Sequence, residues 1–145
     1  MYEHPTAAEL LAAARAQLEQ QVIPTITEPR LRFQTLVAAN VLAIVERELA
    51  DGETHLAAAW QRMSELESSD ESQAASEATP EGAAALRAAV AAQAQRLCAR
   101  IRAGEYDQGP RRKALLRHLR RTAEEELAVA NPRYLERVKR NASSV

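Results

Sequence analysis

The sequence contains few of the residues on which disulfide-bonded, metal-binding and nucleotide-binding proteins depend. Its 145 residues include one cysteine and four glycines, and only 3% are aromatic. A single cysteine excludes an intramolecular disulfide and a cysteine-cluster metal site. The scattered glycines do not form the glycine-rich loop that cradles a phosphate. Because strands favour aromatic and β-branched residues, the shortage of aromatics argues against a sandwich, a barrel or an α/β sheet.

The sequence also shows neither a signal peptide nor an apolar segment long enough to span a membrane. The longest apolar run, residues 36–45, is interrupted by Asn40 and is shorter than a membrane span. The polar start, with Glu3, is unlike the basic region and apolar stretch of a signal peptide. The net charge of −1 gives no overall attraction to nucleic acid. We therefore expect a cytoplasmic protein that binds neither membrane nor nucleic acid.

Alanine, the best helix former, is abundant, with 31 residues. Apolar residues recur at helical spacing in several segments. The predicted fold class is all-α: a compact single-domain bundle (1–145) of about five helices plus a short C-terminal helix. The helices are expected at about 6–23, 29–50, 54–66, 80–103, 109–130 and 132–140.

Local signals mark the ends of these helices. Thr6 and Glu9 have the spacing of a capping box, Asp51-Gly52 is typical of a helix stop, and Gly104 is expected to end the helix at 80–103. Asn131-Pro132 predicts a cap followed by a first-turn proline. Segment 67–79 has no large apolar residue and is predicted to be a mobile acidic, Ser-rich loop. Residues 141–145 are predicted to be a frayed tail.

The apolar pattern also predicts which surfaces are buried. Residues 36–45 are apolar on nearly every side, which is typical of a central helix packed from several directions. Arg15 is expected on the outer face of the first helix as a solubilising charge. The expected inward stripe of the helix at 109–130 consists of Leu116, Leu119, Ala123, Leu127 and Ala130.

The titratable residues do not form a recognisable catalytic or metal-binding constellation. His4, His55 and His118 have no second ligand at a spacing such as H-E-x-x-H, so each is expected at a surface or an interface. Cys98 follows Leu97 on the apolar stripe of its helix and is expected in the core as a small apolar residue. The sequence therefore predicts no enzyme activity, no cofactor and no metal.

Asn40 is the most informative polar residue, because it lies within the most apolar segment. It either bonds a neighbouring helix and fixes the helix register, or presents its amide to a groove or a partner protein. Glu46 and Arg47 belong to a cluster of charge at the end of the same segment, where Arg47 can pair with an acid one turn away. These three residues are candidate interface or structural positions.

The charges are distributed unevenly along the chain. Residues 51–81 contain eight acids against one arginine, whereas residues 111–140 contain ten basic residues against four acids. Arg117, Arg120 and Arg121 form part of a basic helix face. That face either balances the acidic loop as a solvated surface or docks a phosphate or an acidic partner, because arginine binds such groups bidentately.

The third candidate group follows the helix at 109–130. Asn131 is expected to cap the start of a new helix, and Tyr134 can pack against the end of the bundle. Arg133 and Tyr134 near a helix N-terminus would also make a surface that attracts anions. Both interpretations remain open from the sequence.

Four motifs carry a resemblance that extends over almost the whole chain. They are PTAAELL at 5–11, VAAN at 37–40, IVERE at 44–48 and ANPRYL at 130–135. They resemble a family of small bacterial helical proteins of unassigned activity, encoded beside an aminoglycoside-phosphotransferase-like kinase and an acyl-CoA-dehydrogenase-like enzyme. The family includes the small accessory subunit of the hydroxyacyl-CoA kinase of levulinate-type catabolism. The resemblance carries no catalytic residue to this chain.

The resemblance implies a non-catalytic accessory subunit that binds and supports an aminoglycoside-phosphotransferase-like kinase acting on hydroxyacyl-CoA substrates. The alternative hypothesis is a self-associating helical module, a homo-oligomer that binds a small acyl or phosphate-bearing ligand.

Overall fold

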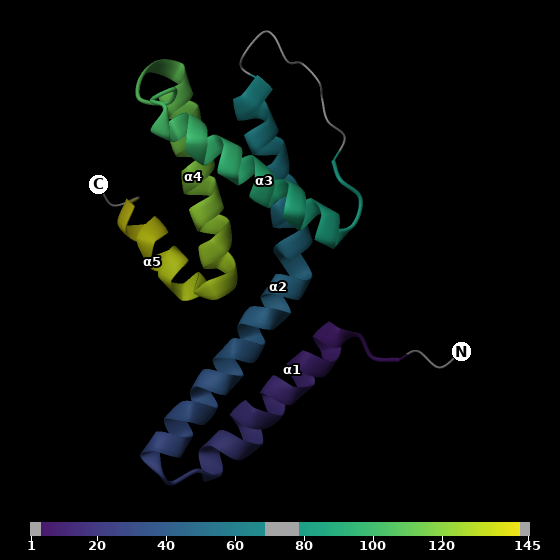
Figure 1. Ribbon diagram of the computed structural model, residues 1–145. Helices are drawn as coiled ribbons and strands as arrows, with labels where there is room; N and C mark the ends of the chain where they lie inside the picture. The colour runs from purple at the N-terminus through teal and green to yellow at the C-terminus, as the bar shows by residue number, and fades with distance from the viewer. Residues whose placement is uncertain (1–3, 69–78, 143–145) are drawn as a thin grey trace. The chain divides into compact units, whose positions relative to one another are not determined.

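The computed structural model describes residues 4–68 and 79–142, and within these residues it is helical and contains no strand (Figure 1). The all-α fold class is therefore confirmed. Five α-helices follow one another along the chain: α1 (Ala7–Gln17), α2 (Pro29–Ser68), α3 (Ala83–Arg102), α4 (Gly109–Ala130) and α5 (Pro132–Ala142). Between α1 and α2 the chain forms a π-helical turn, η1 (Leu18–Val22), and a 3-10 turn, η2 (Ile23–Thr25).

The predicted acidic loop and frayed tail fall largely outside the described residues, at 69–78 and 143–145. Their described ends are helical: Glu67 and Ser68 belong to α2, and Asn141 and Ala142 belong to α5. At these four residues the sequence predicted the helix ends too early.

The chain divides into two compact units, residues 1–52 and residues 53–145. The helix α2 belongs to the first unit up to Gly52 and to the second from Glu53. The single domain expected from the sequence stays a prediction.

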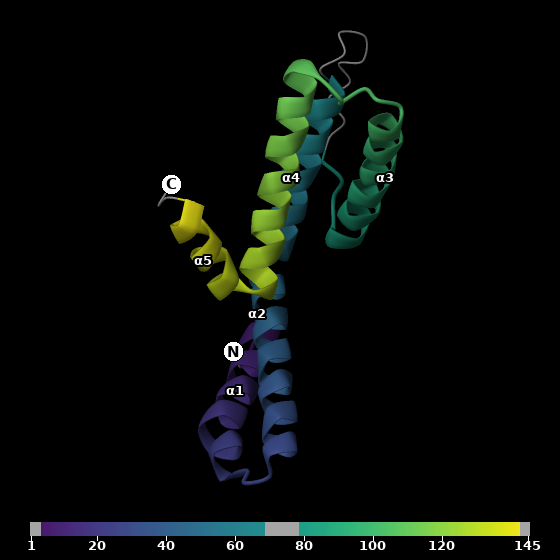
Figure 2. The same ribbon diagram turned by 90° about the vertical axis from the view of Figure 1, so that its left-hand side faces the viewer.

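Unit 1 is a helical hairpin in which α1 lies beside the N-terminal part of α2 (Figures 1 and 2). The capping box of α1 is confirmed, because the Thr6 side chain accepts from the Glu9 N–H at 3.2 Å and Glu9 Oε2 accepts from the Thr6 N–H at 2.7 Å. Glu28 caps α2 in a similar way by accepting from the backbone N–H groups of Arg30 and Leu31. Both helices of the hairpin thus begin at side-chain caps.

The helix stop predicted at Asp51-Gly52 is wrong, because α2 continues without a break to Ser68. A glycine ends a helix when it takes a left-handed conformation, and Gly52 is not among the glycines of positive φ. Glycine inside a helix costs only about 1 kcal/mol relative to alanine. Burial of Trp60 and Met63 in the following turns offsets that cost.

Unit 2 has a core where the C-terminal part of α2 meets α3 and α4. It consists of Met63, Leu66, Leu97, Tyr106 and Leu115. Apolar residues that recur at helical spacing in these segments, Trp60 and Met63 on α2 and Leu86 and Leu97 on α3, are buried as the sequence predicts. Cys98 is exposed, which corrects the prediction that it lies in the core. Tyr106, from the loop after α3, places its hydroxyl 3.5 Å from the Leu66 carbonyl oxygen, to which it donates.

The predicted end of α3 at Gly104 is confirmed by its hydrogen bonds. Gly104 has φ +83°, and its N–H bonds the Ile101 carbonyl at 3.0 Å. The Glu105 N–H bonds the Arg100 carbonyl at 3.2 Å. This pair of bonds is a Schellman motif, which needs a left-handed residue at the position of Gly104.

The inward face of α4 differs from the predicted leucine stripe. Leu116 and Leu119 are 54% and 46% exposed, and the buried residues of α4 are Leu115, His118, Glu125 and Val129. These buried positions follow alternating spacings of three and four through Thr122, which is the pattern of a helix seam. The prediction failed because it counted leucines, whereas polar side chains occupy the middle of the true inward face.

Candidate functional site

The first candidate surface is an apolar face on the part of α2 that belongs to unit 1. We define the α2 apolar face as Leu31, Phe33, Leu36, Val37, Val41, Val45 and Leu49, all of which are between 39% and 66% exposed. Phe33 is the most exposed of them. The predicted central helix, packed from several directions, is therefore wrong for this segment, since only the side containing Ala39 is fully buried.

Asn40 belongs to the same exposed side of α2. At 100° per residue, it lies between Leu36 and Phe33 around the helix. Because Asn40 is exposed, it is not the buried register residue that one interpretation of the sequence required. Its amide lies among apolar side chains on the open surface of the hairpin.

An ion pair between Arg15 and Glu46 links the opposite side of α2 to α1. Arg15 donates two hydrogen bonds to Glu46, at 2.8 and 3.0 Å, and a third to Glu19 at 3.0 Å. Arg15 is therefore an interhelical link and not only a solubilising charge, which corrects the sequence prediction. The hydrogen bond and charge of Arg15 lower the pKa of Glu46. Arg47, the next residue, is half-buried.

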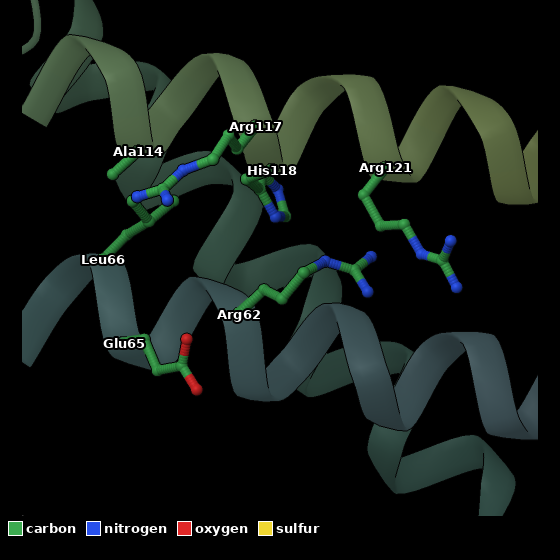
Figure 3. Close-up of a pocket in the computed structure, with 7 residues that line it drawn as sticks. All are labelled: Arg62, Glu65, Leu66, Ala114, Arg117, His118 and Arg121. Carbon is green, nitrogen blue, oxygen red and sulfur yellow. The ribbon is translucent and has the colours of Figure 1, made fainter.

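The second candidate surface is a cleft in unit 2 between α2 and α4, with a volume of about 500 Å³. Figure 3 shows the side chains that line it. Its lining is polar and rich in positive charge: Arg62, Glu65 and Leu66 come from α2, and Ala114, Arg117, His118 and Arg121 come from α4. Volumes of roughly 300–1,000 Å³ are typical of small-molecule sites.

A buried carboxylate beside this cleft organises its arginines. Glu125, 8% exposed, accepts from Arg62 Nη1 at 3.0 Å, from Arg62 Nη2 at 2.7 Å and from Arg121 Nε at 3.0 Å. Burial raises the pKa of Glu125, but the hydrogen bonds and charges of the two arginines outweigh it, so the pKa is lowered overall. Glu125 is therefore a charged acceptor that holds the terminal nitrogens of Arg62.

His118 is buried in the wall of the cleft, at 7% exposed. Its ring points from α4 towards Arg62 (Figure 3). Burial and the nearby positive charge of Arg62 lower the pKa of His118, and the smaller effect of Glu125 opposes them. Its Nδ1 and the Nε of Arg62 are both buried, and neither has a hydrogen-bond partner among residues 4–68 and 79–142.

The other predicted residues lie at separate places on α4 and α5. Arg120 pairs with Glu124 at 3.0 Å on the surface of α4. The structural interpretation of Asn131 is confirmed, because its Oδ1 accepts from the Tyr134 N–H at 3.1 Å. Arg133 is exposed, and Tyr134 lies beneath the guanidinium of Arg137 at 5.0 Å.

The structure thus brings Arg117 and Arg121 together with Arg62, Glu125 and His118. The sequence reasoning missed Arg62 and Glu125, and it did not place His118 in a cleft. The sequence does contain a pattern that could have indicated these residues. The seam through His118 and Glu125 has regular spacing, and Arg62 lies between the buried Trp60 and Met63 on α2. Polar residues on a seam predict a buried polar network.

Within residues 4–68 and 79–142, no helix is both long and apolar enough to cross a membrane. No group of three or more His, Cys, Asp or Glu residues there is placed to hold a metal ion.

These features define a small all-α protein with an exposed apolar helix face and a polar, arginine-rich cleft. The chain belongs to the family described as Domain of unknown function (DUF6285), which matches residues 24–134. The match includes the VAAN and IVERE motifs and all but the last residue of ANPRYL. No curated protein and no solved structure matches the chain.

Proposed function

We propose that this protein is a non-catalytic accessory subunit that binds a partner protein through the α2 apolar face. The resemblance noted from the motifs names the partner as an aminoglycoside-phosphotransferase-like kinase acting on hydroxyacyl-CoA substrates. In this proposal the partner carries out phosphoryl transfer, and the present chain contributes binding surface and support.

The exposed area of the α2 apolar face is the observation that carries the proposal. Seven large apolar side chains lie on one hairpin and are 39–66% exposed. Side chains of this size offer on the order of 500–700 Å² together, near or above the largest patch of a typical monomer. A stable protein interface buries about 800 Å² per partner, so the face is close to the size that a specific partner needs.

The polar residues of the hairpin give the face specificity. Asn40 places an amide among the apolar side chains, and a partner must satisfy that amide or leave it unpaired at a cost of about 1–3 kcal/mol. On the opposite side of α2, the pair between Arg15 and Glu46 holds α1 in place. A fixed hairpin loses little conformational entropy when it docks.

The test is purification of the tagged full-length chain from its native host, with mass spectrometry of what is recovered. We expect a phosphotransferase-like kinase with the unaltered chain and a loss of at least tenfold with Phe33→Ser, because Phe33 is the most exposed member of the face and aromatic side chains are enriched among the residues that dominate interfaces. Leu116→Ser is the matched control, since Leu116 is 54% exposed on α4 in unit 2.

The two parts of the proposal fail in different ways. Recovery of the chain alone, under conditions that preserve weak complexes, contradicts the accessory role. Equal recovery of the kinase with Phe33→Ser and Leu116→Ser contradicts the assignment of the face and leaves the partner in place.

A second candidate function, the self-associating module, uses the same face. Two hairpins can bury their apolar faces against each other, with Asn40 of each copy near the dyad, as a polar residue does at a helix-bundle seam. Sedimentation velocity of the purified chain distinguishes the candidates. A concentration-dependent dimer that Phe33→Ser dissociates favours self-association, and a monomer at all concentrations excludes it.

A further inference from the structure

Three residues that line the cleft in unit 2, Arg62, Arg117 and His118, have nitrogen groups without a partner in the described chain. Arg62 Nε and His118 Nδ1 are buried without a hydrogen-bond partner. Arg117 lines the same cleft and forms none of the ion pairs found among residues 4–68 and 79–142. Leaving a buried donor unpaired costs about 1–3 kcal/mol, so such groups are rare unless something binds them.

The ion pairs of Glu125 fix the positions of the arginines and leave the Nε–H of Arg62 without an acceptor in the described part of the chain. Glu125 accepts two of its three hydrogen bonds from the terminal nitrogens of Arg62, which leaves the Nε–H of the same guanidinium unused within the described residues. Arg121 is also held by Glu125, through its own Nε. One fixed carboxylate therefore holds two arginines at the cleft.

The charge of the cleft is positive overall. Three arginines line it, against Glu65 in the lining and Glu125 beside it, which leaves one net positive charge. His118 adds a donor when Nδ1 carries the proton, either as one neutral tautomer or as the imidazolium. Arg62 and His118 thus supply hydrogen-bond donors at a cleft whose net positive charge also attracts an anion.

We propose that this cleft is a binding site for a small oxyanion of the phosphate class, with Arg62 Nε, His118 Nδ1 and the guanidinium of Arg117 as its donors. A volume of about 500 Å³ accepts the ion or a small phosphate ester. The lining has no aromatic side chain on which a nucleic-acid base could stack, and this favours a small ligand. The site lies within unit 2 and does not depend on the α2 apolar face.

The test follows the His118 ring by NMR in the full-length, isotope-labelled protein at constant ionic strength. Inorganic phosphate, glycerol phosphate, acetate and chloride are titrated separately. We expect a saturable shift of the His118 ring signals with a phosphate species and a rise in the His118 pKa, because the bound anion offsets the charge of Arg62. Acetate and chloride should give weak responses that do not saturate.

Arg117→Gln is the decisive variant, because Arg117 is exposed and its loss leaves the core intact. We expect phosphate affinity to fall about tenfold, as a charge-assisted hydrogen bond is lost. The control is Arg112→Gln, which removes the same charge from an exposed position of α4 outside the cleft. It should change the affinity less than twofold.

Each result decides one question. Saturation with glycerol phosphate but not with inorganic phosphate assigns the site to a phosphate ester, and the reverse assigns it to the free ion. Equal responses to phosphate and chloride, an absence of saturation with both phosphate species, or equal losses in Arg117→Gln and Arg112→Gln overturn the proposal. None of these results bears on whether the protein binds a kinase.

Discussion

Arg62 and Glu125 are 63 residues apart in the chain and meet through two hydrogen bonds, at 3.0 and 2.7 Å. The pair joins α2 to α4 within unit 2, and Arg121 adds a third hydrogen bond to the same carboxylate. Because Glu125 is buried, removal of either partner is expected to destabilise the fold, since the remaining charge is poorly solvated.

Glu125→Gln should therefore destabilise the protein by about 3 kcal/mol, the lower end of the range for a broken buried pair, because Arg62 is partly exposed and keeps some contact with water. Glu126→Gln is the matched control, because Glu126 is the next residue of α4 and is exposed. Urea unfolding measures both variants. Equal midpoints for the two variants would show that the buried pair contributes nothing particular.

The stability of the protein should fall as the pH is lowered from 7.5 to 5.5. Burial and Arg62 lower the pKa of His118 in the folded state below its ordinary value of 6.5. The unfolded chain then binds the proton more readily, so stability is complete above pH 6.5 and is lost as the pH falls towards the folded pKa. The unfolding free energy, measured across this range, reports the loss.

His118→Gln should make that pH dependence shallower, whereas His4→Gln, at an exposed position, should leave it unchanged. Carboxylates contribute mainly below this window, because their ordinary pKa values lie near 4–4.5. A slope between pH 7.5 and 5.5 that is the same in both variants contradicts the role given to His118.

Glu46→Gln should lower the thermal midpoint of unit 1 more than Glu19→Gln does. Both acids pair with Arg15, but Glu46 accepts two hydrogen bonds from the facing helix and Glu19 accepts one within its own helix. Circular dichroism melting at low salt and at 1 M NaCl measures the difference. The difference should shrink at high salt, where the Debye length is about 3 Å.

Gly52→Ala should stabilise the protein by a few tenths to about 1 kcal/mol, since alanine is the better helix residue. The added Cβ would meet only the Glu48 carboxylate group, with Oε1 at 2.9 Å and Cδ at 3.1 Å, which is the far end of a flexible side chain that can move aside. Gly104→Ala should destabilise, because Gly104 has φ +83°. Destabilisation by both substitutions would contradict a continuous helix through Gly52 and favour a helix that ends there.

The sequence was most informative where local chemistry decides the structure. The capping box of Thr6 and Glu9, the Asn131 cap and the stop at Gly104 involve residues a few positions apart, and all three were predicted correctly. The Gly52 stop was predicted by the same logic and failed, because burial of Trp60 and Met63 within unit 2 outweighs a small local cost.

The candidate sites were harder to predict because they depend on contacts between distant segments. Arg15 and Glu46 are 31 residues apart, and no local pattern links them. On α4, the leucines were expected to face inward, yet Leu116 is exposed while His118 and Glu125 are buried. Burial of Glu125 on that seam is possible because Arg62, on another helix, pairs with it. The sequence of α4 alone does not show that this partner is present.

The exposure of the α2 apolar face also bears on how much of this protein a cell can hold. A chain with such a face tends to adhere to other molecules when its partner is scarce. Under the proposed function, copies in excess of the kinase would aggregate or be degraded as orphan subunits. Matched synthesis of the two chains would therefore set the amount of this protein that persists.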